Sequence, residues 1–246
     1  MKIITWNCQG AFRKKAGVIA KYAPDIAVIQ ECEEPGKLHF VEETWRPKNL
    51  VWFGDRGSKG ISILSYTNAK FELYKGYDSS IRHCIPVRVT GCGKLNLIAV
   101  WAMNDNSKRL SYIGQVVRAI EAYKDFLSGG NTFVMGDFNS NTQWDSARPS
   151  GNHTTVVESL AQHRILSAYH AWFEEKQGEE TRPTLHMQRK RRRSFHVDYC
   201  FVPEKWYKRM TALLVGSYKD WRNWSDHSPI VAEFANGGKT QSKKRG

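Results

Sequence analysis

Short runs of apolar residues, each closed by polar or turn-forming residues, recur along most of the chain. The runs at 2–7, 25–30 and 95–101 predict buried β-strands, because they are short and rich in β-branched residues. The other runs of this kind lie at 50–53, 60–66, 71–74, 84–89, 132–135, 195–202, 211–215 and 229–234. The pattern therefore predicts a strand-rich protein.

A smaller number of segments show helical rather than strand periodicity. The clearest helix is predicted at 108–127, and shorter helices are predicted at 12–22 and 156–163. In the long segment, apolar residues recur every three or four positions: Leu110, Ile113, Val117 and Ile120. Many strands interleaved with a few helices favour two sheets packed on each other with helices outside. Periodicity alone leaves a doubly wound α/β fold open.

Length and composition indicate one folded domain. The chain has 246 residues, of which 41% are hydrophobic and nine are tryptophan, enough for a large core. We assign residues 1–236 to this domain and predict a disordered basic tail at 237–246, which is rich in Gly, Lys and Ser.

Nothing in the sequence indicates export or a membrane partner. No stretch reaches the roughly 18 consecutive apolar residues of a membrane helix, and the N-terminus turns polar too early for a signal peptide. The five cysteines are scattered and contain no Cys-x-x-Cys pair, which favours free thiols in a reducing compartment. We predict a cytoplasmic protein.

The net charge of +13 is concentrated in two segments. Five positive charges are contiguous: Arg189, Lys190, Arg191, Arg192 and Arg193. Four more lie in the C-terminal tail. Concentrated basicity is typical of a surface that meets a polyanion. We predict phosphate contact for the basic run at 189–193, with a solvated loop as the alternative, and interpret the tail as solvated.

Polar residues that can do chemistry follow the ends of the predicted strands or lie within them. They are Asn7, Glu31, Asp137, Asn139, Asp198, Asp226 and His227. Strand ends on a rigid scaffold can aim distant side chains into one pocket. Each residue alone has a simpler interpretation as a turn former or a cap. The occurrence of all these segments on one chain favours a shared site.

The chemistry available to such a site is narrow. Carboxylates without cysteine or clustered histidine prefer Mg²⁺ or Mn²⁺ to zinc. A protonated histidine beside carboxylates can donate to a phosphoryl oxygen, and a separate aspartate can deprotonate a water. Together these functions amount to metal-assisted hydrolysis of a phosphate ester.

Six segments resemble the endonuclease/exonuclease/phosphatase superfamily, in particular its exonuclease III, apurinic/apyrimidinic endonuclease and deoxyribonuclease I-like members. The segments are IITWNCQG, DIAVIQECE, KGISILS, FVMGDFNSN, HVDYCFVP and WSDHSPIVAEF, which together run from residue 2 to about residue 234. The resemblance implies a four-layer α/β sandwich, in which two packed mixed β-sheets are flanked by helices.

The same resemblance implies a role for each polar residue in the metal and phosphate shell. Glu31 is expected to bind Mg²⁺, which Mn²⁺ can replace, and Asp226 to be a further carboxylate on the metal side. Asn7 is expected beside the phosphate or the metal.

The resemblance also implies the acid-base roles. Asp137 is expected to activate the attacking water, and Asn139 to position it. Asp198 is expected to orient His227, which contacts the scissile phosphate.

Two positions depart from the nuclease pattern. Trp101 stands where the family commonly has a tyrosine or histidine, and an indole offers a single donor and no acid. Asn104, close by, is expected to meet a phosphate. Gln9 stands where many repair members have an acidic residue, which implies one tightly bound ion.

The basic run favours a nucleic acid as substrate, DNA rather than RNA, cut by a monomeric nuclease. The first alternative is a phosphomonoesterase or lipid/inositol phosphate hydrolase of the same superfamily. The second is a catalytically inactive nucleic-acid binder, suggested by Trp101 and disfavoured because the other site residues are intact.

Overall fold

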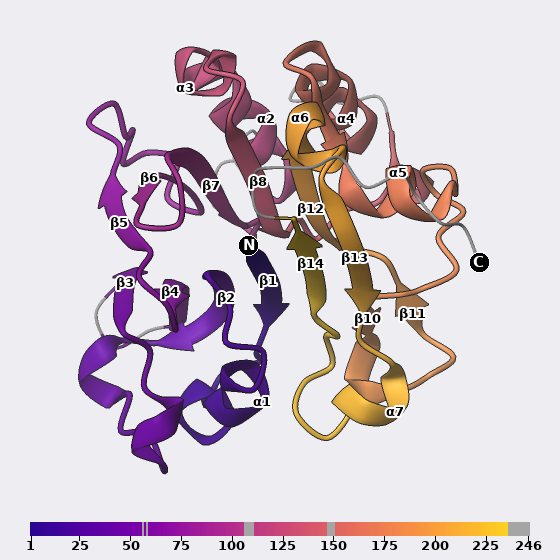
Figure 1. The fold of residues 1–246 in the computed structure, drawn as a ribbon. Coiled ribbons are helices and arrows are strands. Elements are labelled where there is room, and N and C mark those ends of the chain that lie inside the picture. The colour runs from indigo at the N-terminus through magenta and orange to yellow at the C-terminus, as the bar shows by residue number, and fades with distance from the viewer. Residues whose placement is uncertain (56, 58, 106–110, 147–150, 236–246) are drawn as a thin grey trace.

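Two six-stranded sheets form the body of the molecule (Figure 1). The computed structural model describes residues 1–55, 57, 59–105, 111–146 and 151–235. The first sheet has, in spatial order, β13 (Met210–Val215), β14 (Ile230–Phe234), β1 (Lys2–Asn7), β2 (Ile26–Glu33), β4 (Lys59–Ser65) and β3 (Asn49–Phe53). The second has β5 (Lys70–Leu73), β6 (Cys84–Thr90), β7 (Leu95–Trp101), β8 (Thr132–Asp137), β12 (Asp198–Pro203) and β9 (Ile165–Ser167).

Both sheets are mixed, since β1 pairs with β2 and β7 with β8 in parallel while the other pairs are antiparallel. The α-helices are α1 (Ala16–Ala20), α2 (Ile113–Ala122), α3 (Lys124–Ser128), α4 (His153–Gln162), α5 (Ala168–Phe173), α6 (Glu204–Tyr207) and α7 (Tyr218–Trp221). A separate two-stranded ribbon joins β10 (Leu185–His186) to β11 (Ser194–Phe195).

Alternating side chains along the strands create three buried layers. Ile3 of β1 belongs to the core between the sheets, whereas the next residue, Ile4, packs on the α1 side. The outer face of the second sheet is covered in the same way by α2, α3 and α4. The arrangement confirms the predicted four-layer α/β sandwich with two mixed sheets flanked by helices.

Most predicted elements are present, with corrections at three places. The strand predicted at 195–202 is interrupted, because β11 ends at Phe195 and β12 begins at Asp198. The helix predicted at 12–22 is a 3-10 turn (Phe12–Lys14) followed by the short α1. The long predicted helix begins at Ile113 and is divided at Tyr123 into α2 and α3. Residues 108–110, the predicted start of this helix, and the predicted tail at 237–246 lie outside the described residues.

The five cysteines are unpaired, as predicted, and four of them are buried. Within the described ranges, no helix is long and apolar enough to cross a membrane.

Strand register determines where the functional residues meet. In the second sheet, Asp198 of β12 pairs directly with Asp137 of β8. On the other side of β8, Trp101 also pairs with Asp137. In the first sheet, Asn7 pairs with Gln30, the residue before Glu31. Because β1 also contacts β8 across the core, the ends of these strands form one site.

Candidate active site

Asp137 is fully buried at the end of β8, where three donors surround its carboxylate. The backbone N–H of Asn139 donates to Oδ1 at 2.9 Å, and the side-chain amides of Asn139 and Asn7 donate to Oδ2 at 3.1 and 2.9 Å. The preceding Gly136 has a φ of 151°, and a Cβ there would lie 1.9 Å from the Val100 carbonyl oxygen. Only glycine therefore lets β8 approach β7 closely enough to hold Asp137 in this place.

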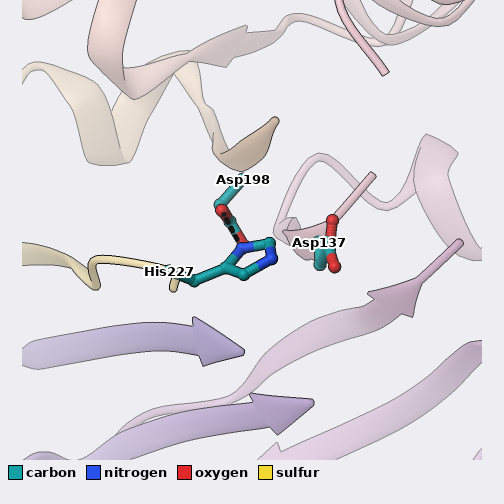
Figure 2. A group of neighbouring side chains, drawn as sticks. All are labelled: Asp137, Asp198 and His227. Carbon is teal, nitrogen blue, oxygen red and sulfur yellow. Dashed lines mark hydrogen bonds and ion pairs between the residues drawn. The ribbon is translucent and has the colours of Figure 1, made fainter. Parts of the chain in front are cut away.

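His227 lies between two carboxylates, with Asp198 on one side and Asp137 on the other (Figure 2). Its Nδ1 lies 2.8 Å from Asp198 Oδ2, and both side chains are buried. The backbone carbonyl of His227 accepts from the Trp6 indole at 3.0 Å. Thr184 fixes Asp198, since its hydroxyl accepts from the Asp198 backbone N–H at 3.0 Å. These contacts hold the imidazole plane and fix which nitrogen faces Asp137.

Electrostatic interactions connect Asp137, Asp198 and His227. Burial and the neighbouring charge of Asp198 raise the pKa of Asp137, and His227 and the Asn7 amide oppose this increase. Burial disfavours the charged imidazole, but Asp198 and Asp137 outweigh it and raise the pKa of His227. The two neighbouring carboxyl groups therefore favour a protonated His227.

Glu31 stands beside this group on a β-bulge of β2. The pairing of β2 with β4 shifts between Ile29 and Cys32, and Glu31 has a φ of 57°, the left-handed region that a side chain seldom adopts. The bulge directs its carboxylate to Asn7, whose amide donates to Glu31 Oε1 at 3.1 Å. Because the same amide nitrogen also donates to Asp137, Asn7 bridges the predicted metal ligand and the predicted base.

Two places in the site could hold a metal ion. Among the described residues, the ligand atoms of Asp137, Asp198 and His227 lie within 4.8 Å of one another. An ion bound there would compete with the hydrogen bond between Asp198 and His227. Glu31 is more accessible, with 22% of its side chain exposed, and its Oε2 already binds a cation, the ammonium of Lys59 at 2.5 Å.

Asp226, the second predicted metal ligand, is held on the loop that carries His227. Its side-chain Oδ1 lies 3.5 Å from the Ser225 hydroxyl, and its backbone carbonyl accepts from the His186 N–H at 2.7 Å. The Ser225 hydroxyl in turn donates to the Asn7 carbonyl at 2.7 Å. Asp226 is therefore fixed next to the site through its backbone, although it is not part of the close group around Asp137.

The basic run lies in the β10–β11 ribbon, and all five side chains are exposed. The Arg189 guanidinium donates to Gln9 Oε1 at 2.7 Å, and the Tyr218 hydroxyl donates to the Arg189 carbonyl at 2.7 Å. The ribbon is joined to the loop that carries Asp226 and His227 by the hydrogen bond from the His186 N–H to the Asp226 carbonyl. The basic run thus adjoins the site through its first residue.

The position occupied by Trp101 serves packing. Trp101 is 6% exposed and belongs to the core between the sheets. One edge reaches a cavity of about 520 Å³ that is shared with Glu31, Lys59, His83 and Asn104. The exposed Asn104 accepts from the Ser111 hydroxyl at 2.8 Å. The cavity extends the site beyond Glu31, and Asn104 lies at its wall.

Three contributors were not singled out in the sequence: Lys59, Thr184 and Ser225. Lys59 opens the quoted segment KGISILS, so a signal for it was present. Thr184 and Ser225 act on the backbone and on neighbouring residues through their hydroxyls. Ser225 also lies in a quoted segment, WSDHSPIVAEF, whereas nothing in the sequence around Thr184 distinguishes it from an ordinary turn residue.

Comparison with known proteins identifies the family and agrees with the fold. The sequence model of the Endonuclease/Exonuclease/phosphatase family matches residues 4–227. The 3'-5' exonuclease NExo from Neisseria meningitidis is 21% identical, with a TM-score of 0.68 over 95% of this chain and 99% of that chain. The 3' phosphatase NExo from Neisseria, bound to a product DNA hairpin, is 21% identical, with a TM-score of 0.69 over 96% and 99%. An AP endonuclease from Archaeoglobus fulgidus is 17% identical, with a TM-score of 0.63 over 95% and 99%. No curated protein sequence matches the chain.

Proposed function

Since the chain belongs to the endonuclease/exonuclease/phosphatase family, we propose that it is a metal-dependent nuclease that hydrolyses phosphodiester bonds, with DNA as the favoured substrate. The observation that carries the proposal is the bridge made by Asn7. One amide donates to Glu31 at 3.1 Å and to Asp137 at 2.9 Å, so a metal ligand and a base face the same small volume.

The acid-base steps follow from the hydrogen bonds of the buried group. Asp137, ionised and held by Asn7 and Asn139, takes a proton from a water as the water oxygen attacks phosphorus in line with the leaving oxygen. His227, kept protonated by Asp198, donates to a non-bridging phosphoryl oxygen on which negative charge increases. The bond from phosphorus to the leaving oxygen then breaks, and solvent protonates that oxygen.

The residues fit a hard divalent cation, Mg²⁺ or Mn²⁺. Glu31 would hold it, with Asp226 on the neighbouring loop as a further carboxylate, because both offer oxygen ligands. The bound ion would neutralise charge on the phosphate and on the leaving oxygen. The ionic contact that Glu31 already makes with Lys59 supports a site suited to a cation.

The basic ribbon beside the site supports a polymeric nucleic acid as the substrate. Arg189 contacts Gln9, two residues after Asn7, and the four cations that follow it in sequence are also exposed: Lys190, Arg191, Arg192 and Arg193. A row of exposed cations suits a phosphate backbone better than a single phosphate group. The similarity to a NExo structure that holds a product DNA hairpin is consistent with DNA.

A phosphomonoesterase acting on a compact substrate is the second candidate. It is favoured by the cavity of about 520 Å³ beside Glu31, where Lys59, Arg82 and His83 could surround one terminal phosphate. A membrane lipid or inositol phosphate would use the same cavity without the basic ribbon.

In the deciding experiment, purified protein is incubated with Mg²⁺ and end-labelled oligonucleotides. The substrates are single-stranded DNA, double-stranded DNA, abasic DNA, DNA with a 3'-phosphate, and RNA. We expect internal or terminal phosphodiester cleavage of DNA, abolished in Asp137→Asn and retained in Asp125→Asn, an exposed aspartate of α3. Release of inorganic phosphate without chain cleavage would instead identify a phosphomonoesterase.

A further inference from the structure

Lys59 forms a direct ionic contact with Glu31, the proposed metal ligand. Its Nζ lies 2.5 Å from Glu31 Oε2, with 50% of the lysine side chain and 22% of the glutamate side chain exposed. The lysine stem crosses the turn after β1, where Gly10 has a φ of 74° and a Cβ would lie 3.1 Å from Lys59 Cε. The missing side chain at Gly10 therefore leaves the passage through which Lys59 reaches Glu31.

The same turn is surrounded by positive charge. Arg189 donates to the side chain of Gln9, and the Lys15 ammonium donates to the Cys8 carbonyl at 2.6 Å. Burial lowers the pKa of Lys15, and Arg189 and Lys59 lower it further. One carboxylate, that of Glu33, opposes these cations: it accepts from the Phe12 backbone N–H at 2.6 Å and raises the pKa of Lys15. A divalent ion that approaches Glu31 therefore meets a carboxylate whose charge the Lys59 ammonium already balances.

We propose that Lys59 is the resident counter-ion of Glu31 and that a divalent cation binds Glu31 only by displacing the lysine ammonium. The inference rests on the proposed metal site at Glu31. Lysine is a point charge on a flexible stem, so its displacement needs no movement of β4. The displaced ammonium remains at the wall of the cavity that Glu31, Trp101 and Asn104 share. There it becomes available to the phosphate of the substrate.

Metal affinity measured without substrate tests this competition. Mn²⁺ binding is followed by electron paramagnetic resonance in wild type, Lys59→Met, Lys59→Arg and Glu31→Gln. The matched control is Arg82→Met, because Arg82 lines the same cavity, is 53% exposed, and pairs with Asp55 at 2.7 Å rather than with Glu31. Methionine keeps the stem across Gly10 while removing the charge.

We expect Lys59→Met to bind Mn²⁺ about tenfold more tightly than wild type, Lys59→Arg to stay near wild type, and Arg82→Met to change affinity by less than about threefold. Melting curves in chelator, where each variant must unfold cooperatively, exclude a folding defect. If Glu31→Gln weakens Mn²⁺ binding but Lys59→Met leaves it unchanged, the counter-ion inference is wrong and the metal site stands. If Glu31→Gln leaves Mn²⁺ binding unchanged, both the metal site and this inference are overturned.

Discussion

Asp198 stands directly opposite Asp137 in the antiparallel register of β12 and β8. Two buried carboxylates on neighbouring strands repel each other, and that repulsion contributes to the raised pKa of Asp137. The pair is tolerated because His227 enters from the loop before β14 and lies between them (Figure 2). The register of the sheet therefore places two carboxyl groups side by side, and His227, from a loop distant in sequence, lies between them and reduces their repulsion.

Replacing Asp137 by Asn should remove the base while preserving shape and most hydrogen bonds. We expect a fall in turnover of about 10²-fold or more, with little change in substrate affinity. Single-turnover rates and separate equilibrium binding distinguish the two effects. Near-normal turnover in Asp137→Asn would show that another group activates the water.

Asp198 and His227 should act as one unit. Asp198→Asn removes one of the charges that raise the pKa of His227, and His227→Ala removes the donor itself. Each should lower the rate by about 10²-fold or more, and the double variant should be little worse than His227→Ala. A four-member mutant cycle on kcat provides the measurement. Costs that multiply in the double variant would mean that the two residues work independently.

The pH dependence should report the raised pKa of Asp137. As a base, Asp137 acts only when ionised, so activity rises with pH through its pKa. Burial and Asp198 move that rise above the range of an ordinary aspartate, about 3.9. Asn7→Ala removes a donor to the ionised form and should move the rise to still higher pH. Profiles of kcat at saturating metal test both statements, and a rise near pH 4 would contradict them.

The individual strands could be predicted from side-chain periodicity, whereas the four-layer architecture was predicted from the resemblance to the superfamily. The strand 95–101 appears in the structure with the same bounds, since every second residue faces one of two apolar layers. By contrast, the short helix α7 and the strand β10 contain too few residues to show a period. They depend instead on contacts such as that between Tyr218 and Arg189.

The candidate site was only partly accessible from the sequence. The predicted acid-base residues meet because strand ends converge, which a pattern of polar residues after apolar runs can indicate. The pairing of Lys59 with Glu31 depends on the bulge at Glu31 and on the passage over Gly10. Both are features of backbone geometry that no residue spacing reveals. Asp226 is held through its backbone, so its predicted metal role remains a prediction.

The metal requirement for activity should depend on Glu31. We expect activity to disappear in chelator and to return with Mg²⁺ or Mn²⁺, because the oxygen ligands of the site suit a hard cation. Glu31→Ala should stay folded and require far more metal for half-maximal activity. Glu72→Ala, on the exposed β5, is the control. Full activity in chelator would rule out the metal-assisted mechanism.

The final prediction concerns the basic ribbon, and the structure indicates which residues to change. Arg189 should be kept, since its side chain holds Gln9 beside Asn7. At Lys190 and Arg191 the ribbon is held through backbone atoms. The Arg191 carbonyl accepts from the Ser194 hydroxyl, and the Lys190 N–H donates to the Met187 carbonyl. A triple variant with Lys190, Arg191 and Arg192 changed to Ala therefore removes charge without removing these contacts. The control changes three exposed lysines elsewhere: Lys75, Lys124 and Lys205.

If the ribbon contacts a nucleic-acid backbone, counterion release makes log affinity fall with log salt by about 0.9 per neutralised phosphate on duplex DNA. The triple variant should bind all DNA sequences more weakly, and its salt slope should be shallower by roughly two to three. The lysine control should keep the wild-type slope, because its lysines lie away from the ribbon. The helices α3 and α6, which carry Lys124 and Lys205, are at the opposite end of the molecule, and Lys75 follows β5 on the opposite side (Figure 1). Turnover on a dinucleotide-like ester, too short to reach the ribbon, should be nearly unchanged in both. An unaltered slope in the triple variant would mean that the ribbon is only solvated, and the compact-substrate phosphatase would become the better-supported function.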